Sequence, residues 1–256
     1  MGIYDTDVIQ VRDGPMVAYR LLQARVSDDP VRSEERAAFA AQLGVQTEDV
    51  QTWDVLQGTS SFEAVTDGVD AVLVGGSGEF SVLSNESWLP SFFDTLGALA
   101  ENGFPTFASC FGFQGMVVAL GGEVVTDESA AEVGTFELTT NENAEGDIMF
   151  GELPRSFVGQ EGHKDRARRL PDCLTNFVSS KRCPNQAIRY KDSMVFATQF
   201  HPELTGNLNR LRFKRYYDMY EQAFGAAGAR SLLDTFMESP EANALLTRFH
   251  RLVSSL

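Results

Sequence analysis

Hydrophobic residues in the first half of the chain form short apolar runs separated by longer amphipathic segments. Residues 69–74, apolar at all but one position, are typical of a strand covered on both faces. Residues 92–100 repeat their apolar positions at helical spacing and predict a helix that ends near Gly103. Earlier strands are expected within 16–26 and over 50–55. The pattern therefore indicates strands that alternate with helices.

Two further segments complete this pattern. A helix is expected to begin after Ser33, a fair N-cap residue, and to end at Gly44. Residues 105–108 read as a short buried strand, and the apolar stretch 116–120 belongs to a helix that stops at Gly121. The order is then strand, helix, strand, strand, helix, strand, helix. It favours an α/β fold with a doubly wound, mostly parallel sheet.

The second half of the chain changes character twice. Residues 123–190 form short strands and polar turns, which we interpret as an antiparallel excursion. It would return to the main sheet through the apolar strand 194–200. We expect a first domain over 1–206 and a helical extension over 207–256 packed on it. The start of this extension places four aromatic residues on one helical face: Phe213, Tyr217, Tyr220 and Phe224.

Composition restricts the class of protein. The 256 residues suffice for one sizeable domain, and 43% hydrophobic with 22% charged residues is ordinary for a globular protein. A formal net charge of −15 argues against nucleic acid or an anionic membrane as a main partner. No apolar run reaches the roughly 18 residues of a membrane span, and the first residues do not resemble a signal peptide. A cytoplasmic location is expected.

The number of cysteines also favours a cytoplasmic location. Three cysteines, an odd number, fit a reducing compartment better than a disulfide framework. Cys173 and Cys183 could pair across their loop, but plain packing residues are the better interpretation of both.

Cys110 is the candidate nucleophile. It stands between the strand 105–108 and the helix that follows, where a strand–turn–helix elbow would hold one side chain at the carboxyl end of the sheet. The positive end of the helix would favour its thiolate form. A lone cysteine beside aromatic residues is more often a small core residue, so this interpretation depends on further residues.

Two residues at the end of the strand 194–200 could complete a catalytic triad. His201 and Glu203 are two positions apart, and Pro202 fixes the backbone between them. In extended chain such residues project to the same side, so the carboxylate could orient the imidazole. The alternative is a solvated His and Glu at the end of a surface strand.

A glycine-rich turn, 75–78, follows the strand 69–74. Glycines allow backbone N–H groups to approach a ligand without interference from a Cβ atom. An oxyanion hole could take one donor from Gly76 and the other from the N–H of Phe111, directly after the candidate nucleophile. In isolation the same segment would pass as an ordinary turn.

Taken together, these segments resemble the class I (triad-type) glutamine amidotransferase family, and are similar to the glutaminase part of GMP synthase and its stand-alone relatives. Four blocks carry the resemblance, in the family's order: 72–77, 108–114, 160–165 and 197–203. The second and fourth are specific, and the other two are supportive. The resemblance implies the flavodoxin-like version of the doubly wound sheet.

Residue roles follow from the resemblance. It implies that Cys110 is the nucleophile, His201 the base and Glu203 the group that orients it. Gln114 would contact the bound glutamine. His163 would lie near the pocket wall, or else be a surface loop histidine. The chain departs from the family at two places: Ser77 stands where relatives often carry proline, and Phe113 where they often carry His or Met.

The implied reaction is hydrolysis of the glutamine side-chain amide through a γ-glutamyl thioester, with no cofactor and no metal. Ammonia would pass to an unknown acceptor, and a separate synthetase subunit is one candidate. The residues after Glu203 are too few for a synthetase domain, and no phosphate-binding loop is present. A γ-glutamyl peptidase of the same fold and a non-catalytic regulatory module stay open as alternatives. A chaperone- or protease-like relative is disfavoured, because 104–108 lacks the acidic residue those proteins usually carry there.

Overall fold

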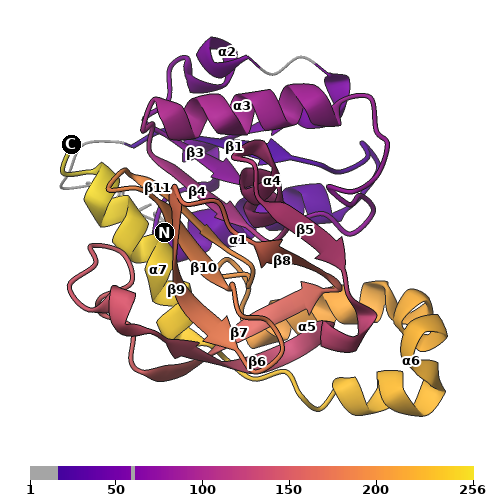
Figure 1. Ribbon diagram of the computed structural model, residues 1–256. Helices are drawn as coiled ribbons and strands as arrows, with labels where there is room; N and C mark the ends of the chain where they lie inside the picture. Colours follow the sequence, from indigo (N-terminus) through magenta and orange to yellow (C-terminus); the bar gives the residue numbers. More distant parts are fainter. Residues whose placement is uncertain (1–16, 59–60) are drawn as a thin grey trace, which may run out of the picture.

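The computed structural model describes residues 17–58 and 61–256 of the chain. Within this part, nine strands form one sheet in the order β2-β1-β3-β4-β11-β10-β9-β6-β7 (Figure 1). The first five strands of that order run parallel to one another. Their bounds are Val50–Asp54 for β2, Tyr19–Gln23 for β1, Ala71–Val74 for β3, Thr106–Ser109 for β4 and Val195–Thr198 for β11. The expected α/β fold with a large, mostly parallel sheet is confirmed.

The remaining four strands of the sheet are antiparallel. They are β10 (Ala187–Tyr190), β9 (Leu174–Ser180), β6 (Glu132–Thr140) and β7 (Ser156–His163). The expected antiparallel segment therefore exists, but most of its strands are hydrogen-bonded into the main sheet and extend it beyond β11. Only β5 (Glu123–Thr126) and β8 (Asp165–Arg169) form a separate two-stranded sheet among the described residues.

The sheet is covered on both faces because its central strands send successive side chains to opposite sides. In β1, Leu21 joins a core with Phe39 of α1 (Val31–Leu43). Its neighbour Leu22 joins a second core with Phe92 of α3 (Leu89–Glu101). Alternation of this kind places α1 and α7 (Pro240–Val253) on one face and α3 and α4 (Phe111–Ala119) on the other (Figure 1).

Two local expectations need correction. Helix α1 begins at Val31, three residues earlier than a helix capped by Ser33 would. The carboxylate of Asp29 accepts a hydrogen bond from the N–H of Val31 at 2.8 Å and so stabilises this earlier start. A short helix, α2 (Phe62–Thr66), was not expected between β2 and β3. Residue 16, the first of the range expected to contain a strand, lies outside the described residues.

Single 3₁₀ turns fill several of the connections. They are η1 (Thr47–Asp49), η2 (Val55–Gln57), η3 (Glu128–Ala130) and η4 (Glu142–Ala144).

After β11 the chain forms α5 (Gly206–Arg215), α6 (Tyr217–Leu232) and α7 (Pro240–Val253). Phe249 of α7 is fully buried in the same core as β1, and the hydroxyl of Tyr19 lies 2.7 Å from Nδ1 of His250. Helices α5 and α6 share a smaller cluster with the start of β6. The division of the chain at residue 206 stays a prediction. No described helix has the length and apolar character that crossing a membrane requires.

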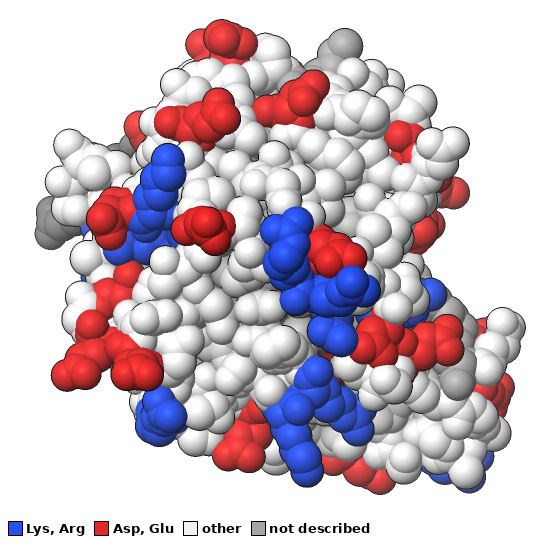
Figure 2. Space-filling model, in the orientation of Figure 1, with Lys and Arg blue, Asp and Glu red and all other residues white. Residues whose placement is uncertain are grey.

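Charged side chains are unevenly spread. Figure 2 shows acidic residues over much of the visible face, with Lys and Arg gathered near its middle, around the β5–β8 pair. Two arginines of β8 form ion pairs: Arg166 with Asp127 at 2.7 Å and Arg168 with Glu123 at 3.2 Å. Both pairs are partly exposed, so each contributes little to stability.

Candidate active site

Cys110 occupies the sharp turn between β4 and α4. Its backbone has φ 50° and ψ −100°, and it is one of two non-glycine residues with positive φ in the described part of the chain. The sheet holds one side of the turn, since its N–H donates to the carbonyl of Thr198 at 2.8 Å. The helix holds the other, through the N–H of Gln114 and the carbonyl of Cys110 at 3.0 Å. A strained residue held from both sides is typical of a nucleophile elbow.

His201 and Glu203 form a buried pair just past β11. Nδ1 of His201 lies 2.6 Å from Oε1 of Glu203, and both side chains are buried. Burial disfavours the imidazolium, but the charge of Glu203 and the contact with Cys110 outweigh it and raise the pKa of His201 to about 10. Burial likewise acts against the carboxylate, yet His201 and Arg212 lower the pKa of Glu203. With Nδ1 bound to Glu203, Nε2 is the ring nitrogen left for proton transfer.

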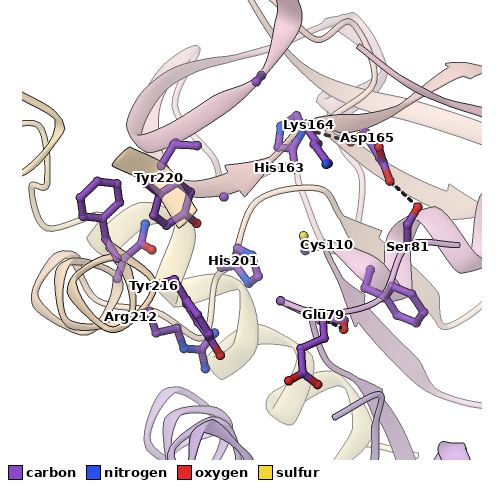
Figure 3. A pocket seen from close by; sticks show the side chains of 18 of the residues that line it. Glu79, Ser81, Cys110, His163, Lys164, Asp165, His201, Arg212, Tyr216 and Tyr220 are labelled. Carbon is purple, nitrogen blue, oxygen red and sulfur yellow. Dashed lines mark hydrogen bonds between the residues drawn. The ribbon is translucent and has the colours of Figure 1, made fainter. Parts of the chain in front are cut away.

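Cys110 and His201 face one cavity of about 440 Å³ (Figure 3). Its wall comes from seven parts of the chain: the segment after β1, the loop after β3, the start of α4, the start of β6, the β7–β8 turn, the segment after β11, and the α5–α6 segment. Of the residues predicted for the site, it is lined by Cys110, Phe111, Gln114, His163 and His201. Ser77 also lines it, whereas Phe113 is fully buried and is not among the described residues of the wall.

The loop after β3 brings Gly76 against the triad. A Cβ atom added at Gly76 would lie 2.8 Å from Cε1 of His201 and 3.8 Å from Cβ of Cys110, so only glycine fits. The N–H of Gly76 donates to Oε1 of Glu35 at 3.2 Å. Phe111 begins α4, and its N–H lies in a first helical turn, where no acceptor within the helix exists. Both oxyanion roles stay predictions. To serve in one, the N–H of Gly76 would have to release the carboxylate of Glu35 and donate to the oxyanion instead.

Glu35 was not anticipated as part of the site. It is fully buried, and its carboxylate also accepts from Nε2 of Gln23 at 2.9 Å and from Nε and Nη2 of Arg25 at 3.1 and 2.9 Å. It lies on the buried face of α1 beside Ala38 and Phe39. A carboxylate on the apolar stripe of a helix was the available signal, because such a group requires a buried partner.

Gln199 was also missed. Its Nε2 lies 3.6 Å from Sγ of Cys110, and its Oε1 accepts from Nε2 of Gln114 at 3.1 Å. The same nitrogen of Gln114 donates to the carbonyl of Asp165 at 2.8 Å. The two amides therefore form a buried chain that ends at the thiol, and the predicted contact of Gln114 with a bound glutamine stays a prediction.

Comparison with known proteins places this geometry in a family. Residues 38–216 match the family model described as "Glutamine amidotransferase class-I". The chain belongs to the class I glutamine amidotransferase family. The match includes the elbow, the glycine-rich loop and the His201–Glu203 segment, and it ends at the start of α6.

Several relatives of this chain are glutamine-hydrolysing GMP synthases or single subunits of them. One such subunit, from Methanothermobacter thermautotrophicus, is 35% identical over 116 residues, which cover 45% of this chain and 60% of that protein. The GMP synthase of Agathobacter rectalis is 30% identical over 141 residues, or 55% of this chain and 26% of that protein. The chain thus spans between about a quarter and 60% of the length of these two relatives.

A crystal structure of a glutamine amidotransferase from Thermotoga maritima has a similar fold. The TM-score is 0.72, and the superposition covers 94% of this chain and 100% of the other. Sequence identity is 18%, so this likeness concerns the fold alone.

His163 is a buried residue at the cavity wall, not a surface loop histidine. Nδ1 lies 3.0 Å from the carbonyl of Asp165, and Nε2 lies 3.2 and 3.3 Å from carboxylate oxygens of Glu132 and Glu161. Burial opposes the charged ring, but the two carboxylates raise the pKa of His163 to about 10. Its contact with a substrate stays a prediction.

Glu132, His163 and Cys183 are close enough to be considered as metal ligands, since one potential ligand atom of each lies within 4.8 Å of the others. A thiol binds a metal only as thiolate. Burial raises the pKa of Cys183 to about 12, and its Sγ donates to the carbonyl of Asn185 at 3.5 Å. All three cysteines of the chain are free thiols, as expected for packing residues at Cys173 and Cys183.

Proposed function

We propose that this chain hydrolyses the side-chain amide of glutamine, or of a γ-glutamyl compound, through a covalent γ-glutamyl thioester. One observation carries the proposal. The strained Cys110 faces the same cavity as His201, whose Nδ1 is held 2.6 Å from Glu203. A nucleophile, a base and an orienting acid in this relation are the parts of a triad. Membership of the amidotransferase family supports it.

The first half of the reaction uses the ion pair of Cys110 and His201. The thiolate attacks the amide carbon, and the carbonyl oxygen becomes an oxyanion that the N–H groups of Phe111 and Gly76 would stabilise. Nε2 of His201 then gives its proton to the departing nitrogen, the C–N bond breaks, and ammonia leaves. Glu203 keeps the ring in the required orientation throughout.

In the second half, His201 accepts a proton from water, and the resulting hydroxide attacks the thioester carbon. The C–S bond breaks, glutamate leaves, and the thiolate is restored beside the imidazolium. No cofactor is required by this sequence of steps.

We propose a separate synthetase subunit as the acceptor of ammonia. The matched relatives from Methanothermobacter thermautotrophicus and Methanococcus vannielii are each named as one subunit of GMP synthase, a name that implies a further subunit in those proteins. A cytoplasmic location would suit both this partnership and the free thiols.

The test is release of ammonia and glutamate from glutamine by the purified chain. Cys110→Ala should reduce the rate by at least about 10⁴-fold, in line with losses of other triad nucleophiles. Cys173→Ala, which changes a half-buried thiol away from the cavity, is the matched control and should retain the rate. Equal rates for the wild type and Cys110→Ala would refute the mechanism. If the wild type is silent, labelling of Cys110 by an electrophilic glutamine analogue separates a site that needs its partner from a non-catalytic module.

A further inference from the structure

The cavity over Cys110 is larger than glutamine needs. Cavities of about 300–1,000 Å³ hold drug-sized ligands, and this one, at about 440 Å³, falls in that range. Figure 3 shows that its two ends differ in chemistry. On the far side of Cys110 lie the polar residues Ser81, Lys164 and Asp165. Beyond His201 lie the rings of Tyr216 and Tyr220, with the guanidinium of Arg212 beside Tyr216.

The aromatic end is a built surface. The rings of Phe213 and Tyr220 stack with centroids 4.5 Å apart and planes 13° apart, and Tyr220 continues to Phe224 at 6.3 Å and 19°. Phe213 is only 2% exposed, which fixes the first ring of the stack. All three residues line the cavity. An apolar group that enters this end would find a preformed wall, which lowers the cost of ordering it.

The aromatic end of the cavity extends to the loop beside the triad. A Cβ atom at Gly78 would lie 3.4 Å from Cζ of Tyr216, so this ring packs on the glycine-rich loop that carries Gly76. Tyr220 and Phe224 lie beyond residue 216, where the family match ends. The aromatic end is therefore contributed in part by a segment outside the matched region.

The proposed reaction determines which part of a bound substrate contacts the aromatic residues. His201 gives its proton to the departing nitrogen, so that nitrogen must face His201 in the bound substrate. Whatever group the nitrogen carries then extends past His201, toward Tyr216 and Tyr220. The glutamyl part, with its charged amino and carboxylate groups, is left facing the polar end. Ammonia alone would leave the aromatic end unused.

We infer that the site accepts γ-glutamyl amides whose amine carries an aromatic or bulky apolar group. This inference rests on the proposed function. The chemistry at Cys110 is unchanged: the C–N bond breaks, His201 gives its proton to the nitrogen, and the free amine leaves in place of ammonia. The same thioester is then hydrolysed to glutamate.

The test compares three substrates: γ-glutamylbenzylamide, γ-glutamylmethylamide and glutamine. The first two release primary alkylamines, so they differ mainly in the ring. Burying a ring on the wall should raise kcat/KM for the benzylamide about tenfold or more over the methylamide. Tyr220→Ala and Phe224→Ala should each bring this ratio toward one. Leu211→Ala, an apolar residue that is 52% exposed and outside the cavity wall, is the matched control and should keep the ratio.

A second measurement needs no variant. When glutamine is the substrate, added benzylamine should intercept the thioester and form γ-glutamylbenzylamide faster than methylamine forms its amide. Cys110-dependent turnover of glutamine with equal kcat/KM for the two amides would overturn this inference and leave the proposed function standing. Absence of Cys110-dependent turnover for all three substrates, together with no labelling of Cys110 by an electrophilic glutamine analogue, would overturn both.

Discussion

The thiol of Cys110 is held from two directions, by His201 and by the amide of Gln199. The contact between Nε2 of Gln199 and Sγ, at 3.6 Å, supplies an N–H donor to a thiolate. Hydrogen bonds to charged groups contribute about 1.5–3 kcal/mol, so Gln199→Leu should lower kcat/KM by roughly 10- to 100-fold. The rate at which iodoacetamide alkylates Cys110 at pH 7 should fall with it. A lower kcat/KM with an unchanged alkylation rate would show that Gln199 acts on substrate or structure instead.

Gly76 is restricted by its neighbours more than by its own backbone. An added Cβ would approach Cε1 of His201 to 2.8 Å, so either the loop or the imidazole must move. Gly76→Ala should therefore lower kcat by about 10²- to 10³-fold, comparable to the loss of one oxyanion donor. Gly78→Ala, where the nearest atom is at 3.4 Å, should cost far less. Steady-state rates of ammonia release for the two variants check this order.

At the residue scale, the predictable part of the site was the part that is local in sequence. Cys110 could be located from the strand and helix on either side of it, and His201 with Glu203 from a spacing of two. Gln199 and Glu35 were missed because their contacts depend on segments far away along the chain: 89 residues separate Gln199 from Cys110, and 41 separate Glu35 from Gly76. Spacing within one strand or helix gives no information on such contacts.

Among the elements, α4 lies against strand β3 at Gly112. A Cβ there would lie 2.8 Å from side-chain atoms of Val74 and 2.9 Å from its carbonyl oxygen. Gly112→Ala should therefore destabilise the chain by about 1–3 kcal/mol, as overpacking does. Gly97→Ala in α3 is the matched control, because its Cβ would meet only a carbonyl oxygen at 3.9 Å. That variant should gain about 0.5–1 kcal/mol from helix propensity. Urea unfolding of both variants gives the comparison, and equal effects would contradict it.

Elements with a strong apolar pattern were predictable, and those defined by their partners were not. The strands β3 and β4 and the helix α3 carry such patterns and occur where expected. Helix α2, with five residues, is too short for a period to show. Short strands were expected over 123–190 as a whole, but the place of β9 and β10 in the main sheet depends on pairing with β6 and β11. Register is a relation between two segments, so neither segment alone reveals it.

Over the whole molecule, the site joins parts of the chain that the sequence presents as separate. Its wall runs from Arg25 to Phe224, so it combines both halves of the sheet with the C-terminal helices. The C-terminal segment was expected to pack on the first domain. Its part in the cavity was not anticipated, because the aromatic face 213–224 reads equally well as one that packs on the core.

Two buried imidazoliums should make the stability of the whole chain depend on pH. The pKa values of His163 and His201 are raised to about 10, above the ordinary value near 6.5 of an unfolded chain. Between these limits the folded state binds more protons than the unfolded state, so the free energy of unfolding must fall as pH rises. The stabilising contribution is complete below about pH 6.5 and is lost as pH passes about 10. Each retained proton contributes a slope of at most about 1.4 kcal/mol per pH unit.

Urea unfolding at pH 6.5, 8 and 10 would measure this slope. Glu203→Gln removes the charge that most favours the imidazolium of His201, so its stability should fall less steeply with pH than that of the wild type. His163→Gln should remove the part of the pH dependence that is due to His163. The double variant Glu203→Gln/His163→Gln should lose both parts, since the two rings bind different carboxylates. A wild-type slope no steeper than that of the double variant would mean that the folded chain holds both rings neutral. The proton that His201 gives to the leaving nitrogen would then have to come from the thiol of Cys110 during the reaction, not from a preformed ion pair.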